Sequence, residues 1–434
     1  MENSEITERD TSSEFATTPV PPEQQVGWVR VAIISAMVAF SLPTFVAGAE
    51  VFLATDNQSG LVAILLGGTL LTFIAALCGS IGARTHLSSY MLTRIAFGTQ
   101  GAAFVNLAFA LSLLGWFGVN IDLFSSASQL IARDVFGAQP PAWLMDLGAG
   151  VIMTVTTIYG FKAINTLSMW LVPVLMGVTA ILFYQTATDH GLATVLNLEQ
   201  PQTITLGYAV SSVVGGVIIG AVILPDITRF MRHWRGAVFT ALLSYLVVQS
   251  IVMLAGGLAA DVQGESDFLQ VLLVMGLGWA AFVIVIAGSW VLNALNLYSA
   301  TLSVEATWPR IGTTPLTLLL GAAGTLAAFA NILDYFLDFL FYLAVVFVPV
   351  AGVIIVDHFV SRPHAYRPEQ LATLRGWSPA GLSAWLCGSV VALLGEEGVI
   401  TLSGMAAVDA IVVSALVYFG LARRSGSVTD KDGN

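Results

Sequence analysis

Charged residues and cysteines are both scarce in this sequence. Only 10 % of its 434 residues are charged, whereas 56 % are hydrophobic, a balance far outside that of soluble globular domains. The two cysteines, Cys78 and Cys387, lie within apolar stretches, so we expect neither a disulfide framework nor a metal cluster. The scarcity of charge indicates a polytopic membrane protein.

Motifs of enzymatic chemistry are missing as well. The five histidines lie scattered in or near predicted loops, and the sequence contains no Ser-His-Asp arrangement, metal-ligand spacing or phosphate-binding loop. Acidic residues outnumber basic ones by 27 to 16, which argues against nucleic-acid binding. We therefore expect no cofactor, no metal, no enzymatic activity and no obligate protein partner; a membrane-embedded enzyme and a channel are retained as alternatives.

Long apolar runs are abundant. Because a helix needs about 20 apolar residues to cross the bilayer, the sequence predicts an all-α integral membrane protein with twelve transmembrane helices. The third and eighth runs are long enough to be tilted or to extend beyond the membrane. The predicted spans are 31–54, 60–81, 101–130, 143–160, 164–187, 205–224, 236–260, 271–304, 312–331, 334–357, 379–395 and 399–421.

The basic residues indicate the orientation. Of the 16 lysines and arginines, all but Arg133 fall on the side of the two chain ends. Since basic loops face the cytoplasm, we expect a multi-pass protein of the cell inner (plasma) membrane with both termini cytoplasmic. Residues 1–26 and 422–434 are polar and are expected to form disordered cytoplasmic tails.

The first span is interrupted. Pro43 and Gly48 lie in its middle, and a proline inside a helix leaves the carbonyl four residues earlier, that of Ala39, without its donor. In lipid such a break is tolerated only where it is buried in protein or lines a watery cavity. The first span is therefore predicted to be a broken helix that lines a substrate site.

The sixth span is also interrupted, by Gly215, Gly216, Gly220 and Pro225. Two broken helices five spans apart are typical of inverted repeats with a binding site near the bilayer midplane. We therefore predict one repeat over 27–190, a second over 200–360, and two additional spans over 376–421. Close helix packing is the alternative explanation for the glycines.

Two polar pairs lie within the spans. Trp116 and Asn120 are four residues apart, on one helix face, where an indole could stack on a flat ring and an amide could read its edge. Asn293 and Asn296 form a second amide pair in the eighth span. Helix packing and hydrogen bonding between helices are the respective alternatives.

Carboxylates within or near the spans are a further group of candidates. Glu50 lies ~10 Å beyond Pro43 along the helix, where it could carry a coupling proton or be an ordinary polar residue in a wet entrance. Asp122 is a second acid with no assigned role. Asp226 follows Pro225 directly, and we expect a structural or gating role for it.

Five motifs occur in order along the chain: GARTHL at 82–87, RIAFG at 94–98, GWFG at 115–118, DITRF at 226–230 and PVAGVIIVD at 349–357. Over residues 31–360 the chain resembles the nucleobase:cation symporter-1 family, especially cytosine and purine permeases. The resemblance implies the five-plus-five inverted-repeat fold of the leucine-transporter type, followed by two C-terminal helices.

The resemblance also implies a substrate site. Trp116 matches a tryptophan that stacks on the nucleobase, Asn293 matches an asparagine that hydrogen-bonds it, and residues 215–220 match unwound backbone. The implied substrate-binding residues are Leu42, Thr44, Phe45, Trp116, Asn120, Gly215, Gly216, Val217, Asn293 and Asn296.

Two departures from the family pattern affect the coupling ion and the substrate. Sodium-coupled relatives carry hydroxyl residues where this chain has Val291 and Leu292, which leaves main-chain carbonyls near Val38 and Ser41, too few for a good sodium site. A proton, with Glu50 as a candidate carrier, is therefore favoured over sodium. Val217 stands where close cytosine permeases have an aromatic residue, so the base would rest on Trp116, with Phe45 as a candidate partner.

We therefore expect a secondary transporter that imports a nucleobase by cation-coupled alternating access, with cytosine as first choice and a purine next. A carrier of the same fold for hydantoin, allantoin or hydroxymethylpyrimidine is the main alternative. A major-facilitator carrier would have a longer central loop than the short 225–235 connection. An amino-acid carrier would need a site for a charged substrate.

Overall fold

The computed structural model describes residues 19–159, 161–191, 202–265, 267–305, 307, 311–330, 332–362, 366, 374–400 and 402–429. These residues are almost entirely helical. The α-helices are α1 Trp28–Met37, α2 Leu42–Ala54, α3 Asn57–Thr85, α4 Ser89–Phe97, α5 Thr99–Phe136, α6 Ala142–Tyr159, α7 Phe161–His190, α9 Leu206–Val222, α10 Pro225–Thr228, α11 Trp234–Ala241, α12 Gln249–Gln263, α13 Phe268–Val274, α14 Gly278–Val283, α15 Trp290–Glu305, α16 Thr313–Ala328, α17 Phe336–Val356, α18 Pro379–Glu396 and α19 Ala406–Thr429. The 3₁₀-helices are η1 Pro22–Gln24, η2 Val38–Phe40 and η5 Ile332–Tyr335, and the π-helices are η3 Leu242–Val248, η4 Ile284–Ser289 and η6 Asp357–Ser361.

Helices occupy every predicted span, with shifted ends. Within the described ranges, seven are long and apolar enough to cross a membrane, and the bent pair formed by Trp28–Phe40 and Leu42–Ala54 raises the number to eight. Two further apolar helices, Ala142–Ile158 and Thr313–Ala328, are shorter. The all-α membrane architecture is confirmed, while the count of twelve spans and the inverted repeat stay predictions.

The predicted eighth span, 271–304, is wrong as a single helix. Gly276 adopts φ +72°, a conformation that glycine enters without steric cost, and this turn separates α13 from α14. Helices α14, η4 and α15 then run on from Gly278 to Glu305. The turn interrupts an apolar run that hydropathy alone cannot divide. The long third span is confirmed as α5, whose 38 residues extend ~57 Å.

Polar side chains determine where several helices begin. The carboxylate of Asp56 accepts a hydrogen bond from the backbone N–H of Ser59 at 2.9 Å and caps α3. Ser88 caps α4 and Thr205 caps α9 in the same way. Because the first N–H groups of a helix have no internal partner, these caps fix the helix boundaries at the chain's polar loops.

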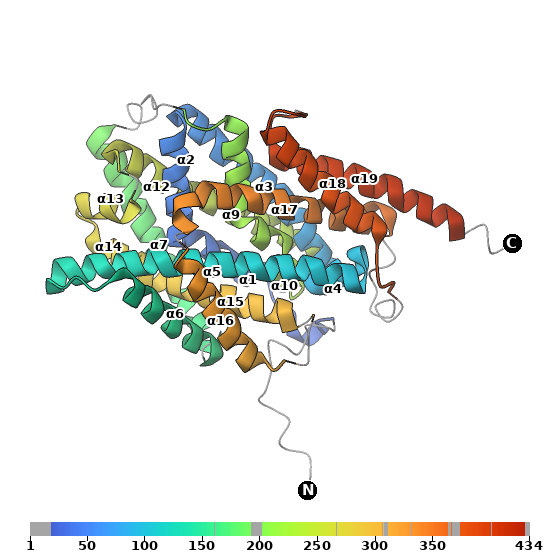
Figure 1. Ribbon diagram of the computed structural model, residues 1–434, viewed down its shortest axis with the longest axis horizontal. Coiled ribbons are helices and arrows are strands. Elements are labelled where there is room, and N and C mark those ends of the chain that lie inside the picture. The colour runs from blue at the N-terminus through green and yellow to red at the C-terminus, as the bar shows by residue number, and fades with distance from the viewer. Residues whose placement is uncertain are drawn as a thin grey trace, which may run out of the picture.

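Long and short helices cross closely. Figure 1 shows α5 running across the molecule, with α18 and α19 side by side towards the C-terminal end and α6 and α16 together on one side of α5. Small residues permit these contacts: a Cβ added to Gly321 of α16 would lie 2.3 Å from the hydroxyl of Thr154 in α6, and one added to Gly388 of α18 would lie 2.7 Å from the carbonyl of Ala410 in α19.

The predicted unwinding of span 6 at 215–220 is wrong. Helix α9 is continuous from Leu206 to Val222, and the chain departs from it only at Ile223, before α10 begins at Pro225. A Cβ at Gly215 would lie 1.6 Å from the carbonyl oxygen of Leu340 in α17. Gly215 thus allows α9 and α17 to pack backbone to backbone, which is the alternative explanation that glycine content left open.

The predicted N-terminal tail is shorter than residues 1–26. Residues 1–18 lie outside the described part, but the segment from residue 19 onwards is packed against the helices. The backbone N–H of Val20 donates to the carbonyl of His86 at 3.2 Å, and that of Val26 donates to the carbonyl of Phe230 at 2.7 Å. Val20 is buried. The packed segment therefore connects the end of α3 to the chain beyond α10.

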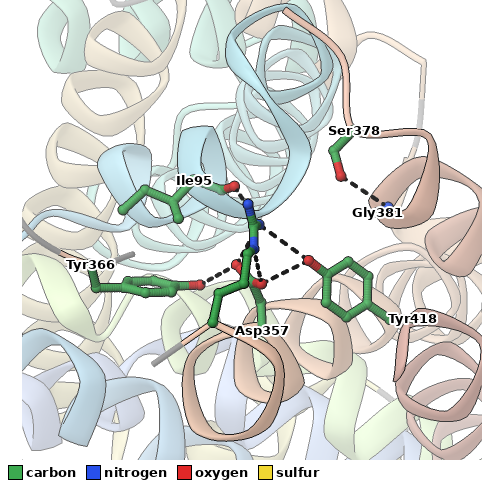
Figure 2. A network of polar contacts seen from close by, with 7 residues as sticks. Ile95, Asp357, Tyr366, Ser378, Gly381 and Tyr418 are labelled. Atoms are coloured by element: carbon green, nitrogen blue, oxygen red, sulfur yellow. Dashed lines mark hydrogen bonds and ion pairs between the residues drawn. The ribbon is translucent and has the colours of Figure 1, made fainter. Parts of the chain in front are cut away.

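A buried carboxylate at the end of α17 joins this helix to two others (Figure 2). Asp357 accepts hydrogen bonds at 2.7 Å from the hydroxyls of Tyr366 and Tyr418, and its other contact is an ion pair with Arg362, also at 2.7 Å. Arg362 Nη2 donates to the carbonyl of Ile95 in α4 at 2.8 Å. Burial, together with the neighbouring carboxylate, raises the pKa of Tyr366 well above its ordinary value, so this phenol stays a neutral donor. The network ties the end of α17 to α4 and α19.

We predict that Gly215→Ala lowers the melting temperature of the purified protein, because the added methyl group overlaps the Leu340 carbonyl; forced overpacking costs about 1–3 kcal/mol. Gly216→Ala is the matched control. A Cβ at Gly216 would lie 3.8 Å from its nearest neighbour outside the backbone of its own helix, Cδ1 of Leu340, which is ordinary van der Waals contact, and alanine favours the helix. Equal melting temperatures for the two variants would contradict the packing role of Gly215.

We predict that Asp357→Asn also destabilises the protein, by about 1–2 kcal/mol, because it removes the buried charged acceptor of the Tyr366 and Tyr418 hydroxyls. The ion pair with Arg362, whose side chain is 42 % exposed, adds less. Thermal unfolding monitored by intrinsic fluorescence measures the effect. The exposed Asp189→Asn serves as a control and should unfold like the wild type. An Asp357→Asn protein as stable as that control would show that the network adds nothing to stability.

Candidate functional site

The first span is broken, as predicted. Helix α1 passes into η2, Ser41 adopts an extended conformation (φ −93°, ψ 153°), and α2 restarts at Leu42, with a bend of 54° between the two segments. Pro43 lies in the first turn of α2, where its missing N–H costs nothing. The interruption thus falls at Ser41, two residues before the proline that signals it.

The break opens onto a cavity of about 310 Å³. Its walls come from α1, η2 and α2, from α5, from α9 and α10, from η3 and α12, and from η4 and α15. These elements belong to predicted spans 1, 3, 6, 7 and 8. A mostly apolar hollow of this size with a few polar groups is typical of a small-molecule site.

Seven of the predicted site residues line this cavity. Trp116 is one of them, and its indole is held edge to face by two rings at the start of α17: Phe336 at 6.1 Å and Phe339 at 5.4 Å between centroids. Since α17 fixes the ring plane, the indole is a preformed surface in the cavity wall. The seven lining residues are Val38, Ser41, Thr44, Trp116, Gly216, Val217 and Asn296.

Four other predicted residues are absent from the cavity wall. Leu42 and Phe45 are fully buried, and Phe45 stacks on Phe268 of α13 at 5.2 Å between ring centroids. Gly215 faces α17, and Glu50 lies on α2 beyond the cavity-lining residue Ala47. In this conformation Phe45 is therefore not the second aromatic face that the sequence suggested for a base.

The two remaining asparagines are Asn120 of α5 and Asn293 of α15, and both use their amide groups within the protein. Asn120 Nδ2 donates to the carbonyl of Trp116 at 2.8 Å, and Asn293 Nδ2 donates to the carbonyl of Phe117 at 3.0 Å. Both residues are fully buried, and the Oδ1 atom of each lacks a hydrogen-bond partner among the described residues. The bond from Asn293 to Phe117 is a hydrogen bond between helices, the alternative to substrate binding that the sequence left open. The substrate-binding role of Asn293 stays a prediction.

Several polar residues of the cavity were not predicted from the sequence. Ser212, Ser244, Gln249 and Ser299 all line it. Each lies in a mostly apolar run of the sequence, but nothing in their spacing gathers them into one site. Only the packing of different spans reveals that they share a wall.

Asp226 lies at the edge of the same cavity and is held by α4. Its Oδ1 accepts from the backbone N–H of Ser89 at 2.8 Å, and its Oδ2 accepts from the Ser89 hydroxyl at 2.7 Å. This carboxylate links α10 to the first residue of α4, which agrees with the structural or gating role expected for it.

Near the break the structure adds one hydroxyl that the sequence prediction did not count. Ser289 of η4 is fully buried, and its Oγ has no hydrogen-bond partner in the described ranges. The neighbouring Gly288 packs against span 1, where an added Cβ would lie 3.0 Å from the carbonyl oxygen of Phe40. With Ser41 and Thr44, whose hydroxyls lie 3.2 Å apart, Ser289 brings the hydroxyls near the break to three, while Leu292 at the predicted position is apolar.

Known proteins resemble this chain over nearly its full length. The cytosine permease of Escherichia coli (strain K12) is 27 % identical over 406 residues, covering 93 % of each chain. The hydantoin permease of Microbacterium maritypicum is 25 % identical over 384 residues, covering 82 % of this chain and 77 % of the relative.

Solved structures share the fold. The closed conformation of Mhp1, described as a nucleobase-cation-symport-1 family transporter with bromovinylhydantoin bound, aligns with a TM-score of 0.80 at 22 % identity, covering 95 % of this chain and 96 % of that one. A sodium-coupled sialic acid symporter aligns with a TM-score of 0.65 at 12 % identity, over 92 % of this chain and 90 % of that one. The family model described as "Permease for cytosine/purines, uracil, thiamine, allantoin" matches residues 19–417. The chain is therefore a transporter that belongs to this permease family, the nucleobase:cation symporter-1 family.

Proposed function

We propose that this protein imports a nucleobase, with cytosine as first choice and a purine next, by cation-coupled alternating access. The observation that carries the proposal is the cavity at the break in span 1, into which α5 presents Trp116 as a flat aromatic wall. A planar heterocycle would stack on that indole. Hydrogen-bonding groups of α2, α9 and α15, namely Thr44, Ser212 and Asn296, would read its edge.

The broken span supports alternating access. The extended backbone at Ser41 has no helical hydrogen-bond pattern, so α1 and α2 can change their mutual angle without breaking a continuous helix. A cation bound near this break would favour the occluded state. Coupling arises because the cation and the substrate each stabilise the same conformation, and the coupling is reciprocal.

For the coupling ion we favour a proton over sodium. The side chains beside the break supply few oxygen ligands: Ser41, Thr44 and Ser289 carry neutral hydroxyls, whereas Leu292 is apolar. Glu50 is the candidate proton carrier. We further propose twelve spans, arranged as two inverted repeats of five spans each followed by two additional C-terminal spans. Both termini would lie in the cytoplasm of an inner-membrane protein, which the near absence of basic residues on the opposite side supports.

Other heterocycles are the alternative substrates of the same site. The hydantoin permease and the bromovinylhydantoin-bound Mhp1 are among the relatives, and hydantoin, allantoin and hydroxymethylpyrimidine each carry a small ring rich in hydrogen-bonding groups. With Val217 rather than an aromatic residue on the α9 wall, the cavity can accommodate more than one ring shape.

We predict that Trp116→Ala reduces uptake of radiolabelled cytosine to background, because the stacking surface is lost. The variant protein should still reach the membrane in normal amounts. Trp143→Ala is the matched control, since Trp143 is 57 % exposed on α6 and should transport normally. Normal uptake by Trp116→Ala would rule out the proposed site.

We predict that cytosine raises the melting temperature of the purified protein without sodium, and that the shift changes between pH 5.5 and 7.5. A thermal-shift panel of nucleobases, hydantoin, allantoin and amino acids, with and without sodium, measures both effects. Glu50→Gln should remove the pH dependence of the shift. Stabilisation that required sodium would overturn proton coupling, and stabilisation by hydantoin alone would reassign the substrate.

A further inference from the structure

Span 7 contributes a polar wall to the cavity that the resemblance does not account for. This span consists of α11, the π-helix η3 and α12, and it presents Ser244, Tyr245 and Gln249 to the cavity. All three side chains are at least 95 % buried. They therefore face the hollow rather than lipid or bulk water.

Gln249 carries an unsatisfied acceptor. Its Nε2 donates to the sulfur of Met253 at 3.8 Å, while its Oε1 has no hydrogen-bond partner among the residues that the structure describes. The Oγ of Ser244 likewise has no hydrogen-bond partner among the described residues. A buried amide oxygen without a donor is costly, and such a group in the wall of a cavity points to a ligand that supplies the donor.

The π-helix explains how the two groups come to lie together. The backbone N–H of Gln249 donates to the carbonyl of Ser244, five residues earlier, so that the two residues stand on successive turns of the same face. In a regular α-helix, residues five apart point ~140° away from each other. The wider turn thus directs both side chains into one cavity, and π-bulges of this kind occur often at functional sites.

The position of Gln249 along the membrane matches that of the break. Helices α2 and α12 approach closely, since a Cβ at Gly48 would lie 2.0 Å from the carbonyl oxygen of Met253. Just past the C-terminal end of α2, Asn57 at the start of α3 donates its Nδ2 hydrogen to Asp261 near the C-terminal end of α12 at 2.7 Å, so α2 and α12 run in the same direction. Gln249 lies one turn before Met253, on the side of the break, and it lines the cavity together with Ser41 and Thr44.

We propose that Gln249 is a specificity-determining residue of the substrate site: its Oε1 accepts a hydrogen bond from an N–H group on the edge of the heterocycle, and the Ser244 hydroxyl lies beside it as a second polar contact. The inference rests on the proposed function. It assigns the substrate class more narrowly, to flat rings that carry an N–H or amino donor, and it brings span 7 into the site.

The test is the equilibrium dissociation constant of purified protein for cytosine, with hydantoin in parallel. Gln249→Met keeps the length of the side chain and removes the acceptor, so cytosine should bind about tenfold to hundredfold more weakly. Gln249→Glu keeps an acceptor oxygen and should retain more affinity than Gln249→Met. Gln185→Met is the matched control, because Gln185 of α7 also has a buried Oε1 without a partner in the described chain but lies outside the cavity wall.

Two analogues identify the donor. 1-Methylcytosine lacks the ring N1–H, and 2-pyrimidinone lacks the exocyclic amino group. For the analogue that has lost the donor to Gln249, wild type and Gln249→Met should bind equally, whereas the other analogue should show the same loss as cytosine. The difference between the two analogues is a signature that a merely structural glutamine would not produce.

The outcomes separate the inference from the proposed function. A wild-type protein that binds neither hydantoin nor any nucleobase, purines included, would overturn both. If the wild type binds and Trp116→Ala does not, while Gln249→Met binds cytosine as tightly as Gln185→Met, the proposed function stands and the role of Gln249 is overturned. An equal loss for cytosine and both analogues, or a change only in sodium dependence, would also overturn it.

Discussion

Every backbone polar group within a bilayer must find a partner inside the protein, and the arrangement of this molecule depends on that constraint. Span 1 violates the helical pattern at Ser41, so other helices must surround the interruption and exclude lipid from it. Helices α5, α9, α12 and α15 do so, and the cavity lies between them. The backbone interruption, rather than any particular side chain, therefore determines where the site lies.

Backbone chemistry made part of this predictable. Pro43 removes a hydrogen-bond donor wherever it stands, so a break near it could be inferred from the sequence alone. Apolar length predicted the helices for a similar reason, since the thickness of the bilayer sets a minimum. Five motifs in order indicated the family, whose model matches residues 19–417, and the cavity contains Trp116 and Asp226 from two of these motifs.

Residues with more than one physical use could not be assigned from the sequence. Glycine loosens a helix and also lets two helices touch, and at Gly215 the approach of Leu340 selects the second use. Asparagine binds ligands and also joins helices, and Asn293 is engaged with Phe117. Gln249 was missed because its direction depends on a π-turn, whose extra residue leaves no mark on the apolar pattern of span 7.

The indole of Trp116 is oriented by Phe336 and Phe339, neither of which lines the cavity. The orientation of this part of the wall is thus set by two residues that do not themselves line the cavity. Divergence among related carriers can accordingly proceed through these supporting rings, by tilting one flat surface, while the residues that touch the solute remain the same.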